Sequence, residues 1–270
     1  MRPGLVQMWT TAPGGSLQRC PLGLLAVAIA VLVGGCRKER RPSRPVSPPA
    51  LREDAAPRPA RPSQGPASAL PVCSLGLRAA IASTLAAAPG EGSGSYEPPS
   101  AAARRMLKDA LRAALGPAPG EAADFAARAG YRACQSGELL LLLPPRGHAL
   151  VALRRGAARQ ALVSVPHPLF EPKTALEGRL AFERWRARAL VVAGAHRCAS
   201  SEASGCPGRT KVCGGGPRAF PRSDAGHAQD SQFQAAHEAL AGLFSDLVVV
   251  SLHGMAEDGI SLSDGSSGPG

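Results

Sequence analysis

The sequence feature that most constrains the fold is a series of short, nearly continuous apolar runs that begins at residue 138. Runs of this length, rich in Val and Leu, are typical of strands buried on both faces of a sheet. They cover residues 138–143, 148–154, 161–165, 188–194 and 246–252. Capping-box patterns at Thr174-Ala-Leu-Glu177 and Ser231-Gln-Phe-Gln234 predict two helices between the last three runs. The alternation predicts an α/β fold with a mainly parallel or mixed sheet and flanking helices.

Three of the predicted strands end in a histidine, at His167, His196 and His253, in a chain that has six histidines. If these strands are parallel neighbours, the three imidazoles reach the carboxyl edge of one sheet, which is where open α/β sheets bind their ligands. We therefore interpret the triplet as a functional site. His148, at the start of a predicted strand, and His237, inside a predicted helix, are interpreted as structural.

A carboxylate partner for this site is predicted at Glu171, four residues after His167 in His-Pro-Leu-Phe-Glu. Zinc sites of the His/carboxylate type combine two ligands on one tight loop with a distant histidine and leave the fourth position to water. The alternative interpretation of Glu171 is a solvent-exposed acid near the start of a helix, where the dipole favours it.

The order of these residues resembles that of the zinc-carboxypeptidase-like amidohydrolases, and within them the poly-γ-glutamate hydrolase and N-formylglutamate amidohydrolase groups. The resemblance is carried by His167, Glu171 and Thr174, then Ala195-His196-Arg197, then Leu252-His253-Gly254-Met255, and covers about residues 160–262. It implies that His167, Glu171 and His253 hold Zn²⁺ and that the reaction is hydrolysis of an amide bond.

The chain departs from that family at three points. The spacing from His167 to Glu171 is one residue shorter than in the γ-glutamyl hydrolases, and a Gly-rich insert with cysteines, residues 198–216, separates the second and third strand ends. The third departure is that a later carboxylate acts as the general base in these enzymes, and nothing obvious replaces it here beyond Glu257 and Asp258. A C-terminally truncated domain and an inactive one both remain open interpretations.

Four further residues are expected to line the site. A guanidinium at Arg197 would clamp a substrate carboxylate or stabilise an oxyanion. Asp224 and His227, in the loop before the last predicted helix, would orient a ligand through hydrogen bonds. His196 is expected to face the same cleft without necessarily binding the metal. Ordinary loop polarity is the alternative explanation for the charged residues.

The N-terminal segment has the layout of a signal peptide, because Arg2 and Arg19 precede an apolar run, Leu22–Val33, that stops at Gly34-Gly35-Cys36. A membrane-spanning helix needs about 20 apolar residues, which is more than this run supplies. Val33-Gly-Gly-Cys36 resembles the lipobox of bacterial lipoproteins, which implies a lipid anchor on Cys36 and a location in the cell envelope, on the periplasmic or outer-membrane side. A secretory signal with an incidental cysteine and a transmembrane helix are the alternatives.

Composition divides the chain into four segments. Residues 1–35 are predicted as the signal peptide and residues 36–71, rich in Pro and Arg, as a disordered tether. Residues 73–133 are predicted as a helical region with helices at 74–88, 100–115 and 121–133, and residues 138–270 as the α/β domain.

Cysteine usage favours an oxidising compartment. Without Cys20 in the signal and Cys36 in the lipid anchor, five cysteines remain, an odd number that forbids complete pairing within the set. The first predictions are a bond between Cys73 and Cys134 and one pair inside the insert. The spacing of the three cysteines in and beside the insert fits no standard zinc finger.

The formal net charge of +11 does not indicate a nucleic-acid-binding protein. Aromatic residues make up 4% of the chain, which is too few for the stacking platforms of single-strand binders. The basic residues just after Cys36 are instead expected to rest on anionic lipid headgroups.

Two functions compete on this sequence. The first is an envelope lipoprotein with a zinc-dependent amide hydrolase domain, acting on a cell-wall peptide or a γ-glutamyl amide. The second is a catalytically inactive lipoprotein of the same fold that acts as a binding module. A base within reach of the metal site would separate them.

Overall fold

The structure of the chain is a computed structural model that describes residues 5–11, 70–116, 119–255 and 260–263. Within these residues the helices are α1 (Leu77–Ala86), α2 (Ala101–Leu115), α3 (Glu121–Arg128), α4 (Thr174–Arg184) and α5 (Gln232–Leu243). The strands of the main sheet are β1 (Leu5–Thr11), β2 (Arg132–Ser136), β3 (Leu139–Leu143), β4 (Leu150–Arg154), β5 (Arg159–Val165), β6 (Ala187–Val192), β9 (Val248–Met255) and β10 (Ile260–Ser263). Two short strands, β7 (Arg209–Thr210) and β8 (Arg218–Ala219), form a separate hairpin.

The main sheet is mixed, in the order β10-β1-β9-β5-β6-β4-β3-β2. Strands β1, β9, β5 and β6 run parallel to one another. Strands β4, β3 and β2 continue the sheet from β6 by antiparallel pairing, and β10 pairs antiparallel with β1 at the other edge. The predicted α/β class with a mixed sheet is therefore confirmed.

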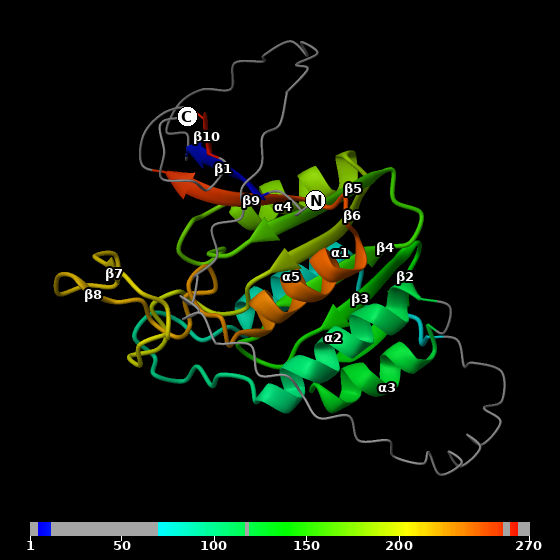
Figure 1. Cartoon of the computed structure of the whole chain (residues 1–270), viewed down its shortest axis with the longest axis horizontal. Helices are drawn as coiled ribbons and strands as arrows, with labels where there is room; N and C mark the ends of the chain where they lie inside the picture. The colour runs from blue at the N-terminus through cyan, green and yellow to red at the C-terminus, as the bar shows by residue number, and fades with distance from the viewer. Residues whose placement is uncertain (1–4, 12–69, 117–118, 256–259, 264–270) are drawn as a thin grey trace, which may run out of the picture.

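Helices cover both faces of this sheet and give a three-layer arrangement (Figure 1). One core lies between the sheet and the helices α2, α3 and α5, and it takes Leu162 and Val191 from the strands. The other core lies against α1 and α4, and it takes Val163 and Leu190. Neighbouring strand residues point to opposite faces, which explains why the strands read as continuous apolar runs.

The predicted helical region packs on the sheet as part of these two cores. Its third helix is shorter than predicted, because α3 ends at Arg128 and residues Arg132–Ser136 form β2. Gly130 lies between them at a φ of 82°, a left-handed conformation that ends the helix. The prediction of helix as far as Ala133 was therefore wrong.

The two capping predictions had different outcomes. Ser231 caps α5 as predicted, since its side chain accepts a hydrogen bond from the backbone N–H of Gln234. At α4 the N-cap is Lys173, at a φ of 76°, and Thr174 is already helical. The Thr174 hydroxyl donates to the carbonyl of Glu171 instead, so the capping box predicted there was wrong.

The N-terminal predictions fall largely outside the described residues. Leu5–Thr11 lies within the range predicted as a signal peptide, and it forms β1, paired in parallel with β9. Cys36 and the predicted tether, apart from residues 70 and 71, are not among the residues that the structure describes.

None of the helices in the described part of the chain is both long enough and apolar enough to cross a membrane.

Candidate metal centre

Two neighbouring parallel strands bring His167 and His253 to the same edge of the sheet. Ser164 near the end of β5 is in register with Ser251 of β9. His167 follows β5 directly after Pro166, and His253 lies on β9 two residues beyond Ser251. The two imidazoles therefore emerge side by side, with their ring centroids 5.2 Å apart.

Glu171 joins them because the chain turns back immediately after His167. The backbone N–H of Glu171 donates to the carbonyl of His167 at 2.8 Å, which closes a single helical turn. This turn returns the carboxylate to the imidazole four residues earlier. Gly254 allows the approach from β9, since a Cβ atom there would lie 3.1 Å from the Cβ of Glu171.

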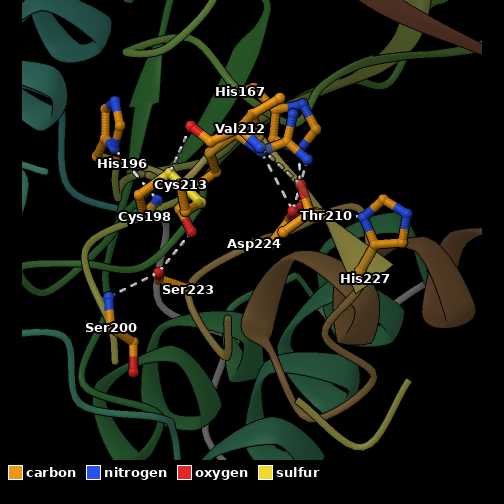
Figure 2. The surroundings of a disulfide bond; sticks show 11 residues. His167, His196, Cys198, Ser200, Thr210, Val212, Cys213, Ser223, Asp224 and His227 are labelled. Atoms are coloured by element: carbon orange, nitrogen blue, oxygen red, sulfur yellow. Dashed lines mark hydrogen bonds and ion pairs between the residues drawn. A yellow bond between two sulfur atoms is a disulfide. The ribbon is translucent and has the colours of Figure 1, made fainter. Parts of the chain in front are cut away.

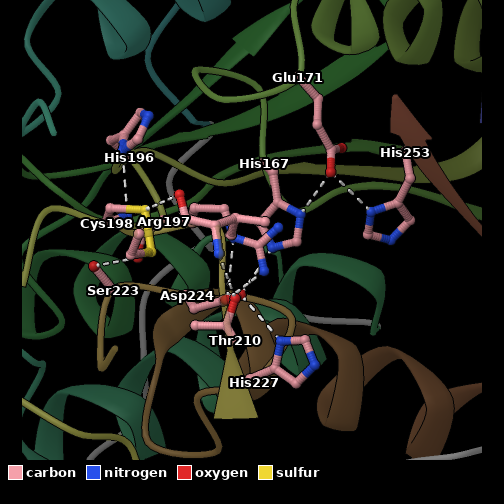
Figure 3. Close-up of polar contacts among 12 residues, drawn as sticks. His167, Glu171, His196, Arg197, Cys198, Thr210, Ser223, Asp224, His227 and His253 are labelled. Atoms are coloured by element: carbon pink, nitrogen blue, oxygen red, sulfur yellow. Dashed lines mark hydrogen bonds and ion pairs between the residues drawn. A yellow bond between two sulfur atoms is a disulfide. The ribbon is translucent and has the colours of Figure 1, made fainter. Parts of the chain in front are cut away.

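The three side chains form one buried group. Oε1 of Glu171 lies 3.0 Å from Nδ1 of His167 and 3.3 Å from Nδ1 of His253 (Figure 3). The candidate ligand atoms all lie within 4.8 Å of one another, so the group could hold a metal ion. Oε2 of Glu171 is buried without a hydrogen-bond partner among the described residues, which fits a carboxylate that binds a cation.

Each imidazole is held from behind by a second polar side chain. Nε2 of His167 lies 2.8 Å from Oδ1 of Asp224, and Nε2 of His253 lies 3.2 Å from Oγ of Ser251. When Nε2–H donates to these oxygens, the lone pair of each ring is on Nδ1, beside Glu171. Partners of this kind fix the tautomer and orientation of metal-binding histidines.

Asp224 is the most highly connected residue of the centre. Besides His167, its carboxylate accepts hydrogen bonds from Arg197, at 2.7 Å from Nη2 and 3.2 Å from Nε, and lies 3.2 Å from Nδ1 of His227. Burial raises the pKa of Asp224, but the hydrogen bonds from His167 and His227 and the charges of His167 and Arg197 bring it below its usual value. Asp224 is therefore ionised at neutral pH.

Two of the three candidate ligands, Glu171 and His253, have pKa values shifted toward the form that binds metal, whereas the pKa of His167 is shifted the other way. Burial raises the pKa of Glu171, but the hydrogen bonds and charges of His167 and His253 outweigh it and lower this pKa to about 2. Burial lowers the pKa of His253, which favours the neutral imidazole. For His167, burial lowers the pKa, but the hydrogen bonds with Asp224 and Glu171 give a net increase.

The other predicted site residues lie around this group. Arg197 is tied to Asp224, and its guanidinium lies 5.3 Å from the centre of the Phe170 ring. His196 is not part of the metal-binding group: its Nδ1 accepts from the backbone N–H of Cys198, and Figure 3 shows it apart from the cluster. Glu257, the predicted base, lies outside the described residues.

A disulfide fixes the segment that carries Arg197. Cys198 is bonded to Cys213, and nearby Ser223 accepts from the backbone N–H of Ser200 and donates to the carbonyl of Arg197 (Figure 2). These contacts join the insert to the loop of Asp224. The predicted pair inside the insert is thus confirmed.

The second predicted bond, between Cys73 and Cys134, is also confirmed. Cys206 is held in a disulfide as well. All five described cysteines are therefore in disulfide bonds, and none of them has a free thiol.

Three residues at the centre were missed by the sequence analysis. Ser251 had a signal, because residues two apart on a strand share a face and Ser251 precedes His253 by two. The sequence contained no signal that Phe170 would lie under the guanidinium of Arg197. Phe220 directly follows β8, beyond the insert, and its ring stacks on His227 with centroids 3.6 Å apart, a contact that spacing alone did not predict.

Comparison with protein-family models, with curated proteins and with solved structures finds no match to this chain.

Proposed function

We propose that this chain binds zinc between His167, Glu171 and His253 and hydrolyses an amide bond. The observation that best supports the proposal is the arrangement of the two imidazoles, which both turn Nδ1 toward Glu171 while Nε2 contacts Asp224 or Ser251. Two imidazole nitrogens and a carboxylate are a donor set of catalytic zinc sites, which leave a fourth position open. Zinc bound there would polarise a carbonyl group and lower the pKa of water.

The residues of the chain have distinct roles in this proposal. Asp224 and Ser251 keep the imidazoles in one orientation, so little rearrangement accompanies metal binding. Glu171, ionised at neutral pH, neutralises part of the charge of the cation. Arg197 places a positive charge beside the centre, held between Asp224 and the Phe170 ring, where it would attract an anionic group of the substrate.

The substrate class follows from the expected location. A lipid anchor on Cys36 would place the domain in the cell envelope, where a cell-wall peptide or a γ-glutamyl amide is accessible. We propose one of these amides as the substrate.

A metal-binding module without catalysis is the second candidate, and one observation favours it. Both carboxylates of the described centre are already committed, since Glu171 lies between two imidazoles and Asp224 binds three side chains. Neither is free to accept a proton from water. Catalysis would need a base from outside the described residues, for which Glu257 is our candidate.

Metal content of the purified protein tests the zinc site. After incubation with Zn²⁺ and removal of excess metal, the wild type is expected to retain one zinc per chain by mass spectrometry. His253→Ala and His167→Ala should retain almost none, while the control Asp230→Asn, outside the group, should match the wild type. Equal zinc content in wild type and His253→Ala would contradict the proposal.

Hydrolysis by the zinc-loaded protein then separates the two candidates. For an enzyme, γ-glutamyl or cell-wall peptide amides should be cleaved, and Glu257→Gln should abolish cleavage while zinc content is unchanged. If the zinc-loaded wild type cleaves none of these amides, the binding module is the better description. If Glu257→Gln cleaves as fast as the wild type, Glu257 is not the base.

A further inference from the structure

A second group of polar side chains lies in a small cavity at the same edge of the sheet, outside the metal centre. Its lining includes Tyr96, His148, Ala149, Ser223, Gln232 and Phe233. Ser223 and Ala225, the neighbours of Asp224 in the chain, both line it, so the cavity adjoins the loop that supports His167. Its volume is about 10 Å³, which is close to the minimum that one water molecule requires.

Gln232 is the unusual residue of this cavity. It is the first residue of α5, is only 1% exposed, and ranks among the largest fully buried side chains. Neither Oε1 nor Nε2 of its amide has a hydrogen-bond partner among the residues that the structure describes. Buried amides nearly always make hydrogen bonds, because an unpaired one loses its interactions with water and gains nothing in return.

His148 presents a second polar atom of the same kind. Its Nδ1 is also buried without a partner in the described part of the chain. Burial lowers the pKa of His148, which favours a neutral ring with one nitrogen able to accept a hydrogen bond. Because His148 and Gln232 line the same cavity but do not bond to each other, a molecule between them would satisfy both.

We propose that this cavity binds one structural water molecule, which bridges Nδ1 of His148 and the side-chain amide of Gln232. The bridge would join the segment before β4 to the start of α5, next to the loop of Asp224. The polar atoms of His148 and Gln232, unpartnered within the described residues, distinguish it from a wholly apolar void, which stays dry. The proposal is independent of zinc and of hydrolysis.

A double-mutant cycle tests the bridge. Gln232→Leu, His148→Phe and the double variant would be unfolded in urea at pH 8, where histidine protonation contributes little. Each single change is expected to lower the folded-to-unfolded ratio about tenfold, because it leaves the water and the other residue without a partner. The double variant should be about as stable as the less stable of the two single variants, because either single change already removes the bridge.

Other outcomes would overturn the proposal. If the amide is simply unpaired, Gln232→Leu should stabilise the protein, because an apolar group of similar shape then replaces an unsatisfied one. If no molecule couples the two residues, the two effects should add. Gln234→Leu, on the same helix but only partly buried, is the matched control and should change the ratio by about twofold at most.

A crystal structure of the wild type gives a second, direct readout that does not depend on the variants folding. Electron density for one water between His148 and Gln232 is expected. A cavity without density, or an amide that turns to bond with protein atoms, would contradict the proposal even if the variants were unstable.

Discussion

Asp224 shows how a single residue organises the candidate metal centre. Its carboxylate is completely buried and accepts hydrogen bonds from His167, Arg197 and His227. Burying an isolated carboxylate is very unfavourable, so these donors are needed to keep it charged. Their common acceptor also fixes their positions relative to one another, because each donor must reach the same two oxygens.

At this scale we predict that Asp224→Asn weakens zinc binding without removing a ligand. The amide keeps the shape of the carboxylate, but it has no charge and can accept on only one of its two polar atoms. Loss of a carboxylate that orients a metal-binding histidine typically lowers metal affinity by about 10-fold to 100-fold. Competition with a chromophoric chelator would measure this change.

The matched control is Asp230→Asn. Asp230 also binds an arginine, Arg222, but both side chains of that pair are about one third exposed. It should leave zinc affinity unchanged. Equal affinities of Asp224→Asn and the wild type would show that His167 does not need this partner.

At the scale of elements, a partly buried histidine, His237, connects α5 to β5. Nδ1 of His237 lies 2.8 Å from the carbonyl of Phe233, and its Nε2 lies 3.0 Å from Oγ of Ser164. The contacts are satisfied by a neutral ring that donates from Nδ1 and accepts from the serine. Ser164 precedes His167 by three residues, so this contact helps to fix the end of the strand from which the metal centre begins.

This contact predicts a pH dependence of stability. Burial lowers the pKa of His237 despite the hydrogen bond with Phe233, so the unfolded chain takes up a proton at higher pH than the folded one. Stability should therefore fall as the pH drops below about 6.5, by up to about 1.4 kcal/mol per pH unit for this group. Urea unfolding at a series of pH values would measure it.

His237→Gln should make the unfolding free energy less dependent on pH, because glutamine does not titrate and this group no longer takes up a proton on unfolding. Ser164→Ala serves as the control. It removes the contact between Ser164 and His237 but keeps the histidine, so most of the pH dependence of stability should remain. An unchanged slope in His237→Gln would assign the pH dependence to other groups.

Local sequence patterns predicted the elements whose burial is regular and missed those that depend on distant contacts. The apolar runs and the Ser231 cap were recognised because burial on both faces and capping leave local signals. β2 was missed because its sequence, Arg-Ala-Cys-Gln-Ser, acquires strand structure from pairing with β3. The hydrogen bond from His167 to Asp224 could not be located because it spans 57 residues and depends on loop geometry.

At the scale of the whole molecule, the two halves of the sheet differ in content. The candidate metal centre lies at the end of the parallel half, at β5 and β9, where neighbouring strands end at one edge. The antiparallel half, from β4 to β2, is joined to the segment before α1 by the disulfide of Cys73 and Cys134. The parallel half thus positions the candidate metal-binding residues, and the antiparallel half contributes to the hydrophobic core and carries a disulfide bond.

Our prediction at this scale concerns the lipid anchor that we propose on Cys36. Cys36→Ser should release the protein from the membrane fraction, because the thiol that would carry the lipid is absent. Immunoblots of separated membrane and soluble fractions, with Cys20→Ser as the control, would measure the release. If Cys36→Ser stays in the membrane to the same extent as the wild type, the apolar segment itself is the anchor.

The pairing of β1 with β9 has a consequence for the order of events during synthesis. β1 is synthesised well before β9, because the paired residues Leu5 and Val249 are separated by more than 200 residues of chain. At about 5–20 residues per second, the first segment waits on the order of ten to fifty seconds for its partner strand. Throughout that interval β1 has no β9 to pair with, so the segment stays available to other binding partners until β9 has been made.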